Sequence, residues 1–570
     1  MAADFTFEWK RFLGLRDSQE ISEEWKDAES PEMLNFKITD AYQLKKRDGY
    51  FTILDEIEPI RGIWCGEIAG KRYFLEVVGE EFFASETSFD AVSLIEGTVP
   101  GQDKVFFFPF YKAVYLLTGH GILQFDGSVL SPLEPYVPLV MISTTPQGSG
   151  VTFEEANLLT PKIRQSFSPT GQDEQFNPVI RAARQIDWVK KDGVLLSEDD
   201  YYWDEAVGAL IFAQVPKAGT DTVEMQYEPI LSEETKDRIL NCRFALGFGG
   251  GGDTRAFLYG NKDSPAVRYH SGIVDGTPSM RYFPATAYTL VGTGSPITAI
   301  LQHYDRQLIF TEHAAYFSYL EYLTGENQKL IASFPVFSLS GERGCAPEGQ
   351  ALLIENTPCT LDDAGLFRWV STNIRDERNA LCFSDPIARS LRKHNASDAI
   401  LFHRKRTSEL YVYLDPFLYV YRYDLGVFYL HEIPGILGFC EVENELYFYT
   451  DHRICQVGGE SDDGSAISAR WHSAMLSFGE TEKQKRLFRT ALAAKTGEEA
   501  KVKIAFRREN GELEGEKNVI FGAGEEFSHR EISSPLRRFR LLQVCLSADG
   551  TKPFQLLRLS LRGRITDENE

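Results

Sequence analysis

Short runs of apolar and aromatic residues recur about every ten residues along most of this chain, with Gly, Asp or Asn between them. Residues 104–110, 113–118 and 121–125 show the pattern, and the last run ends at Asp126-Gly127. Strands of about five residues at this spacing are typical of a β-sandwich, a barrel or a propeller. Aromatic residues, at 13% of the chain, suit pleated and half-buried surfaces. We therefore expect an all-β protein.

The chain has 570 residues, too many for a single compact core, so two to four folding units are expected. The regular succession of short strands over residues 51–150 and 236–460 predicts a β-propeller with blades of four strands, although no strict blade motif such as a Trp-Asp dipeptide occurs. Residues 151–235 interrupt this rhythm with a complete small β-sandwich pattern, which predicts an inserted domain. Residues 236–246 fit one amphipathic helix or a strand.

Both ends of the chain differ from the middle. Residues 1–50 are predicted to form an extended N-terminal arm with short helical stretches. In residues 466–566, apolar and charged residues alternate, for example over 501–507 and 555–562. Such alternation is typical of an antiparallel sheet with one face in water. It predicts a C-terminal β-sandwich.

The formal net charge is -23. A nucleic-acid-binding protein needs Lys and Arg to displace the counterions of the phosphates, and an anionic membrane requires the same. The charge therefore argues against both classes. An acidic wall repels DNA and lets it pass without sticking, although solubility alone also explains an acidic protein.

The eight cysteines are scattered, and none forms a Cys-x-x-Cys pair or a Cys/His set with zinc spacing. They predict reduced and mostly buried thiols of a protein made in a cytoplasm. The first residues lack the apolar core of a signal peptide, and no run of about 18 apolar residues occurs. We expect no membrane segment and no export signal.

Hydrolysis of a glycoside in a propeller requires paired carboxylates that point inwards. Glu67, Asp126, Glu312 and Asp363 are the candidates, because each follows or ends a predicted strand. Carboxylates are abundant here, with 83 Asp and Glu in total, so this chemistry is the weaker interpretation. A sugar-binding role would use exposed aromatic residues; the candidates are Tyr201, Tyr202, Trp203 and Trp369, for which packing is the stronger interpretation.

Other motifs favour ordinary turns over ligand sites. The glycine run 247–252 lacks the Lys and Ser/Thr of a phosphate-binding loop, and a strand follows it. The acidic turns at 362–365 and 461–464 lack the full oxygen series of a calcium loop. The ten histidines are isolated. We therefore assign no catalytic, cofactor-binding or metal-binding residue, and expect no cofactor.

Four local basic clusters stand out against the acidic total, at residues 389–394, 404–406, 483–489 and 537–540. DNA contacts and ion pairs with a neighbouring subunit both remain open for them. The acidic total favours the ion pairs.

Several motifs, in order along about 80% of the chain, carry a resemblance to a known family. At the N-terminus they are 12–15, 30–36, 46–50 and Arg61-Gly62-Ile63-Trp64; in the middle, 207–227, 255–261, 282–284, 291–292, 296–300, 308–312, 344–347, 363–369, 378–379 and 384–387. In these motifs the chain resembles phage virion proteins of the head–tail stabilisation and tail-nozzle type. These proteins build rings of propeller subunits beneath the portal, commonly sixfold.

The resemblance implies a non-enzymatic structural protein of a phage or phage-derived particle, made in the cytoplasm of the bacterial host and located in the virion. It implies a homo-oligomeric ring, contacts with portal, adaptor or tail components, and DNA that passes without specific binding. Nothing in the sequence encodes the subunit number. The alternative is a β-propeller that binds or cleaves carbohydrate, and a weaker one is a host-side scaffold for protein contacts.

Overall fold

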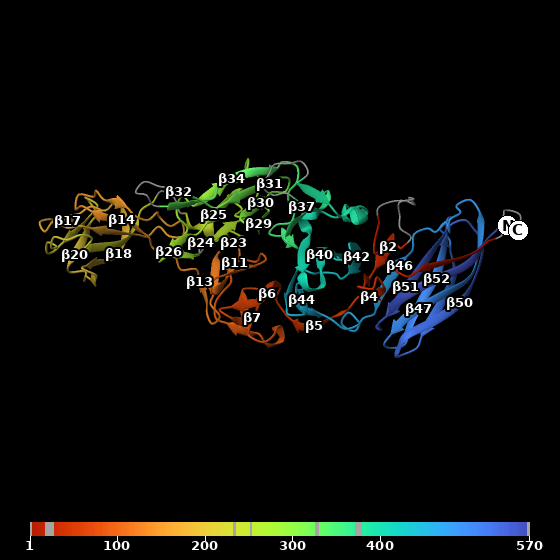
Figure 1. Ribbon diagram of the computed structural model, residues 1–570. Helices are drawn as coiled ribbons and strands as arrows, with labels where there is room; N and C mark the ends of the chain where they lie inside the picture. Colours follow the sequence, from red (N-terminus) through yellow and green to blue (C-terminus); the bar gives the residue numbers. More distant parts are fainter. Residues whose placement is uncertain are drawn as a thin grey trace.

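The computed structural model describes residues 3–17, 28–231, 235–250, 253–324, 330–370 and 379–566. Nearly all of its regular structure is β (Figure 1), which confirms the expected all-β class. The helices of the described residues are short: α1 (Lys236–Leu240), α2 (Ala388–Leu391) and the single 3₁₀ turns η1 (Phe89–Ala91), η2 (Asp385–Ile387), η3 (Ala396–Asp398) and η4 (Lys405–Thr407). Over these ranges, no helix combines the length and the apolar character that a membrane crossing requires.

Seven antiparallel sheets of four strands occupy most of the described chain. The first three are β6 (Ile60–Ile68), β7 (Lys71–Val78), β8 (Glu81–Ser85) and β9 (Ser93–Ile95); β10 (Phe106–Phe110), β11 (Ala113–Leu117), β12 (Ile122–Phe125) and β13 (Leu130–Pro132); and β23 (Phe244–Gly250), β24 (Asp253–Tyr259), β25 (Val267–His270) and β28 (Tyr288–Leu290).

The next four sheets follow the same pattern. They are β29 (Ala299–His303), β30 (Arg306–Phe310), β31 (Ala315–Tyr319) and β34 (Val336–Ser340); β35 (Leu352–Ile354), β36 (Thr357–Asp362), β37 (Gly365–Trp369) and β38 (Ala380–Cys382); β39 (Ile400–Arg404), β40 (Glu409–Leu414), β41 (Phe417–Arg422) and β42 (Val427–Glu432); and β43 (Gly438–Val442), β44 (Glu445–Tyr449), β45 (Arg453–Val457) and β5 (Tyr50–Asp55). Two hairpins project from the third and fourth sheets: β26 (Gly272–Val274) with β27 (Thr277–Ser279), and β32 (Glu321–Thr324) with β33 (Leu330–Ser333).

The first strands of successive sheets are neighbours in space. Strand β6 contacts β10, and the contacts continue through β23, β29, β35, β39 and β43, which contacts β6 again. The last sheet takes its outermost strand, β5, from the start of the chain, because β45 pairs with β5 over residues 453–457 and 50–55. The order of contacts thus returns to its first sheet.

The second strands of several of these sheets, such as β7, β11 and β40, are buried on both faces, which explains their nearly continuous apolar sequences. In β7, Leu75 and Val77 pack into one apolar cluster with the sheet of β10, while Phe74 and Val78 pack into another with the sheet of β43. A strand between two neighbouring sheets buries both sets of alternating side chains. The weak alternation in the sequence follows from this packing.

Two sheets stand between β13 and α1 and lie at one end of the molecule in Figure 1. One contains β14 (Leu139–Thr144), β15 (Val151–Thr152), β16 (Ile163–Phe167), β18 (Ala183–Lys191), β19 (Val194–Leu195) and β22 (Val223–Pro229). The other contains β17 (Gln175–Phe176), β20 (Tyr201–Asp204) and β21 (Ala209–Phe212). Phe167, Val189 and Met225 of the first sheet share one apolar cluster with Phe176 and Leu210 of the second. The two sheets therefore form one packed unit.

Two larger sheets form the opposite end of the molecule (Figure 1). One has the order β3 (Phe36–Ile38), β4 (Leu44–Lys46), β52 (Gln555–Thr566), β47 (Gln484–Thr496) and β50 (Glu525–Phe539), with β1 (Ala3–Trp9) also paired to β52. The other has the order β2 (Glu32–Leu34), β46 (Ile467–His472), β51 (Leu542–Gly550), β48 (Ala500–Arg508) and β49 (Leu513–Phe521).

The N-terminal residues differ from the expected arm over the part that the structure describes. Strand β1 pairs with β52 over residues 3–9, and β2 pairs with β46, so both belong to the C-terminal sheets of the same chain. Phe5, Phe7 and Trp9 alternate with polar residues, which is the signal of a half-buried strand. Trp9 and Phe12 both meet the buried Trp471 edge-on. Burial of these rings holds the segment against its own body.

The ambiguous segment after the inserted unit contains both elements. Residues 236–240 form α1, and β23 begins at Phe244. The glycine run starts as strand, because Gly247 to Gly250 pair with β24 in a hairpin; Gly251 and Gly252 lie outside the described residues.

Candidate functional site

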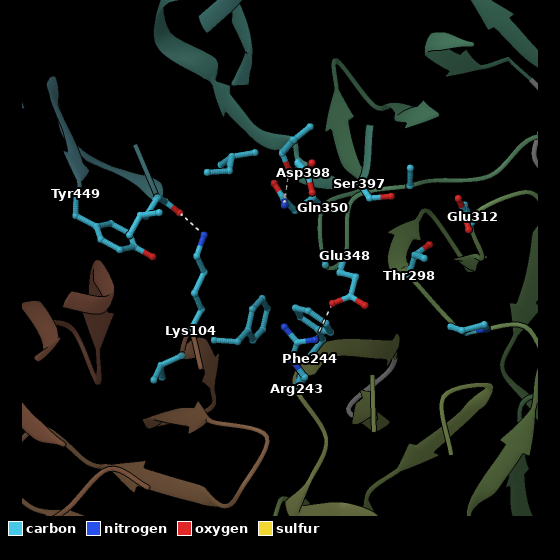
Figure 2. Close-up of a pocket in the computed structure, with 18 residues that line it drawn as sticks. Lys104, Arg243, Phe244, Thr298, Glu312, Glu348, Gln350, Ser397, Asp398 and Tyr449 are labelled. Atoms are coloured by element: carbon cyan, nitrogen blue, oxygen red, sulfur yellow. Dashed lines mark hydrogen bonds and ion pairs between the residues drawn. The ribbon is translucent and has the colours of Figure 1, made fainter. Parts of the chain in front are cut away.

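A cavity of about 680 Å³ lies where the first strands of six of the four-stranded sheets begin. Residues just before or at the start of β10, β23, β29, β35, β39 and β43 line it, and Tyr449 adds the end of β44. Figure 2 shows side chains that reach this space from several separate segments. Convergence of many strand ends on one cavity makes it the candidate binding site of the fold.

One wall of the cavity combines aromatic and basic groups. Phe106 of β10 and Phe244 of β23 meet edge-on at 5.6 Å between ring centroids. The Arg243 guanidinium lies 5.2 Å from the Phe244 ring centre and donates to Glu348 Oε2 at 2.7 Å. The ion pair links the segment before β23 to the segment before β35 (Figure 2).

The second cationic group is Lys104, directly before β10. Its Nζ donates to the Leu437 carbonyl oxygen at 3.1 Å, which joins the sheets of β10 and β43 across the cavity. Burial lowers the pKa of Lys104, and the Asp451 carboxylate opposes this effect. The group therefore serves as a hydrogen-bond donor to the backbone.

The uncharged polar groups of the lining also hold backbone segments together. Gln350 accepts from the Leu401 amide at 2.5 Å and donates to the Ala399 carbonyl at 2.9 Å, so it connects the segments before β35 and β39. The Thr298 hydroxyl donates to the Cys345 carbonyl oxygen at 2.5 Å. The polar side chains of the lining that form hydrogen bonds thus mostly hold the beginnings of strands in place. The carboxylates of Glu312 and Asp398 complete the polar surface of the cavity.

The structure separates the four carboxylates that the sequence suggested. Only Glu312, in the turn between β30 and β31, lines the cavity. Glu67 lies near the end of β6 and Asp363 in the β36–β37 turn, both exposed. Asp126 Oδ1 accepts hydrogen bonds from the Ser128 and Val129 amides, which lower the pKa of Asp126 and make it a turn residue. No pair among these four forms an acid and base in one place.

The aromatic candidates also divide. Trp369 is 2% exposed and donates from Nε1 to the Thr360 hydroxyl at 3.1 Å, so it is a core residue of the fifth sheet. Tyr201 and Trp203 pack partly against the core of the inserted unit, whereas Tyr202 on the same strand is 57% exposed. Of these four, only Tyr202 offers an open ring; it belongs to β20, at the end of the molecule that the inserted unit forms (Figure 1), and it is not among the residues that line the cavity.

The remaining motifs lie in turns and ion pairs of the fold. Within the described ranges, no three His, Cys, Asp or Glu side chains come close enough together to hold a metal ion. Asp462 of one acidic turn pairs with the buried Arg47 at 2.6 Å, and Ala364 in the other donates its amide to Asp362 at 2.8 Å. All eight cysteines are free thiols.

The sequence did not reveal the cavity residues Lys104, Arg243, Glu348 and Asp398. They come from separate segments and carry no shared motif, so only the fold brings them together.

Comparisons with known proteins find only low sequence identity and low structural similarity. No family model matches the chain, and no curated protein matches it. Among solved structures, TmCBM61 in complex with β-1,4-galactotriose is 10% identical, with a TM-score of 0.14, over 21% of this chain and 71% of its own. A glycoside hydrolase is 10% identical, with a TM-score of 0.22, over 89% of this chain and 99% of its own.

An exo-β-1,3-galactanase from Phanerochaete chrysosporium, crystallised with galactose, is also 10% identical, with a TM-score of 0.17 over 91% of this chain and 100% of its own. At these TM-scores the likeness carries no argument about function.

Proposed function

We propose that this chain is a structural protein of a phage or phage-derived particle and forms part of the head–tail connector or tail by assembling into a ring around the DNA path. The proposal starts from the fold. Seven four-stranded antiparallel sheets, with first strands that neighbour one another in a returning order, fit a seven-bladed β-propeller. In this interpretation β5 closes the last blade, and the cavity is one mouth of the central channel.

The domain organisation follows from the same interpretation. The propeller takes β5–β13 and β23–β45, the inserted sandwich takes β14–β22, and the C-terminal sandwich takes β46–β52 with the N-terminal strands β1–β4. Closed β units leave few exposed sheet edges and resist bending, as a load-bearing particle subunit requires.

The observation that carries the proposal is the continuous core between the last sheets of the propeller and the C-terminal sandwich; the inserted sandwich has a core of its own. One apolar cluster includes Leu366 of the fifth sheet, Tyr419 of the sixth and Trp471, Leu492 and Leu559 of the C-terminal sheets. A shared core couples modules into one stiff body, whereas separate cores allow relative motion. Such a body suits fixed assembly, and the polar groups of its large cavity are mostly engaged in holding strand starts.

The proposal includes partners and location. The ring contacts portal, adaptor or tail components in the virion, after synthesis in the bacterial cytoplasm, and DNA passes through it without specific binding. The net charge of -23 supports this passage without binding, because a negatively charged wall repels the phosphates of DNA.

Mass photometry and negative-stain imaging of the purified chain test the proposal, alone and in mixtures with candidate portal and tail proteins. We expect ring-shaped particles of uniform subunit number. A chain that forms no ring under either condition contradicts the proposal.

The second candidate is a carbohydrate-binding or carbohydrate-cleaving propeller, favoured by the cavity that Phe106, Phe244 and Tyr449 line together with Glu312 and Glu348. A glycan array and a hydrolysis screen distinguish it. Binding or turnover that Glu348→Gln abolishes would favour this candidate over the structural role.

A further inference from the structure

Arg268 carries a positive charge inside the protein, between the third and the fourth of the four-stranded sheets. It lies on β25 and is 1% exposed. One guanidinium nitrogen, Nη2, donates to the Ser318 hydroxyl at 2.9 Å and to the Phe334 carbonyl oxygen at 2.7 Å. Ser318 lies on β31, so the arginine connects the two sheets (Figure 1).

The other nitrogens of this guanidinium have no protein acceptor. Nε and Nη1 are buried, and neither donates to any group of the described residues. The Phe257 ring, with its centre 5.1 Å from the guanidinium carbon, covers another side of the group. Arginine has five N–H donors, and only the two on Nη2 are used here.

The charge of Arg268 has no counterion among the side chains that the structure describes. Asp253, on the neighbouring strand β24, pairs instead with Arg255 and accepts from the Tyr322 hydroxyl at 3.0 Å. Burial lowers the pKa of Arg268 to about 9, so the guanidinium keeps its charge at neutral pH. Two hydrogen bonds and one ring face replace only part of the hydration that a buried charge gives up.

A second buried polar side chain without a partner lies beside the first. Gln307 is fully buried, and neither its amide nitrogen nor its oxygen forms a hydrogen bond within the described ranges. It lies on β30 directly opposite Ser318. Directly opposed residues share one face of a sheet, with Cβ atoms about 5 Å apart. The Gln307 amide is therefore next to the hydroxyl that Arg268 contacts.

These groups suit a small anion better than they suit one another. A hydrogen bond from Arg268 to the Gln307 oxygen would use one donor and leave the positive charge uncompensated. The Gln307 amide nitrogen is a further donor, and the Ser318 hydroxyl, which accepts from Arg268, keeps its own proton for a third group. Burial, together with the charges of Arg255 and Arg268, lowers the pKa of the nearby His270 to about 3, which agrees with a positive surrounding.

We propose that Arg268, Gln307 and Ser318 form a buried binding site for a small monovalent anion of the size of chloride. A halide ion accepts hydrogen bonds from several donors and also supplies negative charge, whereas a water molecule supplies hydrogen bonds only. The bound anion stabilises the packing of the third sheet against the fourth. Because the site lies within one chain, the inference is independent of the proposed ring assembly.

Anion-dependent unfolding of the full chain tests the site. Melting temperatures are measured at constant ionic strength while sodium chloride replaces sodium gluconate, whose anion is too large for a buried site. Arg268→Met removes the charge and keeps the length of the side chain, and Gln307→Leu removes the amide. Lys112→Met removes a positive charge from an exposed position and is the control.

We expect chloride to raise the melting temperature of wild type and of Lys112→Met by about 2 °C, because a ligand that binds only the folded state stabilises it. Arg268→Met should respond less than either protein, since general effects of chloride on the solvent act on all variants alike. In gluconate it should melt no lower than wild type, because it lacks the uncompensated charge, and this result also shows that it folds. Gln307→Leu should need about tenfold more chloride for half of the effect.

Bromide locates the ion. In crystals of the full chain grown with sodium bromide, we expect an anomalous difference peak within about 3.5 Å of Arg268 Nη1. Ordered water at this position without a bromide peak would overturn the proposal, as would a carboxylate paired with Arg268. In solution, an equal response of wild type and Arg268→Met to chloride would overturn it as well. None of these results bears on ring formation, which mass photometry measures separately.

Discussion

Glu76 carries a buried carboxyl group that the fold does not satisfy. It lies on β7, opposite Ile63 of β6 and Phe83 of β8. Its side chain is fully buried, and neither carboxyl oxygen has a hydrogen-bond partner in the described structure. Burial, with a smaller contribution from Glu56, raises the pKa of Glu76 from 4.5 to about 8.

This pKa makes the stability of the protein depend on pH. Between pH 4.5 and about 8 the folded chain keeps a proton at Glu76 that the unfolded chain has released. Because the unfolded state binds fewer protons there, stability falls as pH rises through this window. At pH 7 the loss relative to pH 4 is about 3 kcal/mol, with a ceiling of about 5 kcal/mol above pH 9.

Replacement of Glu76 by Gln removes the ionisation and keeps the shape of the side chain. We expect Glu76→Gln to raise the free energy of unfolding by about 3 kcal/mol at pH 7 and about 4 kcal/mol at pH 8, and to have little effect at pH 4.5. Urea unfolding followed by tryptophan fluorescence at pH 4.5, 6, 7 and 8 measures the difference, and the exposed Glu67→Gln is the control. A difference that is constant across these pH values would refute the reasoning.

Three further predictions concern contacts between distant segments. Arg47 is 4% exposed and donates to Asp462 through two nitrogens. Replacing Arg47 by Met should lower the free energy of unfolding by about 3 to 5 kcal/mol, and adding Asp462→Leu should reduce this loss. Additive losses of the two substitutions in urea unfolding would contradict the pairing. Burial, with a smaller contribution from Cys65 on the neighbouring sheet, raises the pKa of Cys440, so Cys440 should react with a thiol-alkylating reagent far more slowly than the exposed Cys382; equal labelling of the two in a peptide map would contradict this. Burial lowers the pKa of His472, but interactions with Cys545 and with the Glu32 carboxylate, whose Oε2 lies 3.0 Å from Nδ1, outweigh it and raise the pKa to about 9. Its contribution should therefore be complete below pH 6.5 and disappear as pH rises through 9, and His472→Gln should flatten melting temperatures over this range.

Local patterns predicted the class of structure well. The short apolar runs and the Asp126-Gly127 turn predict β-hairpins, and β12 and β13 pair across that turn, with Phe125 opposite Leu130. The segment 236–246 remained open because a short helix and the start of a strand follow one another there. Secondary-structure propensity averaged over these residues favours neither a helix nor a strand.

The site was less accessible to sequence reasoning. Glu312 was among the candidates and lines the cavity, but Arg243 and Glu348, which pair there, lie in unremarkable sequence. The basic clusters at 483–489 and 537–540 were visible as local excesses. Their alignment with Arg562 and Arg564 was not, because it depends on which strand lies between them.

By itself, the sequence determined which residues form strands, where turns interrupt them and that acidic groups prevail. These properties depend on neighbours a few positions apart, through side-chain alternation and turn geometry. Tertiary structure alone decided that β5 joins β45, that β1 joins β52 and that six strand ends enclose one cavity. A strand pattern specifies which face is buried but not which partner covers it, and that choice is made by packing between segments hundreds of residues apart.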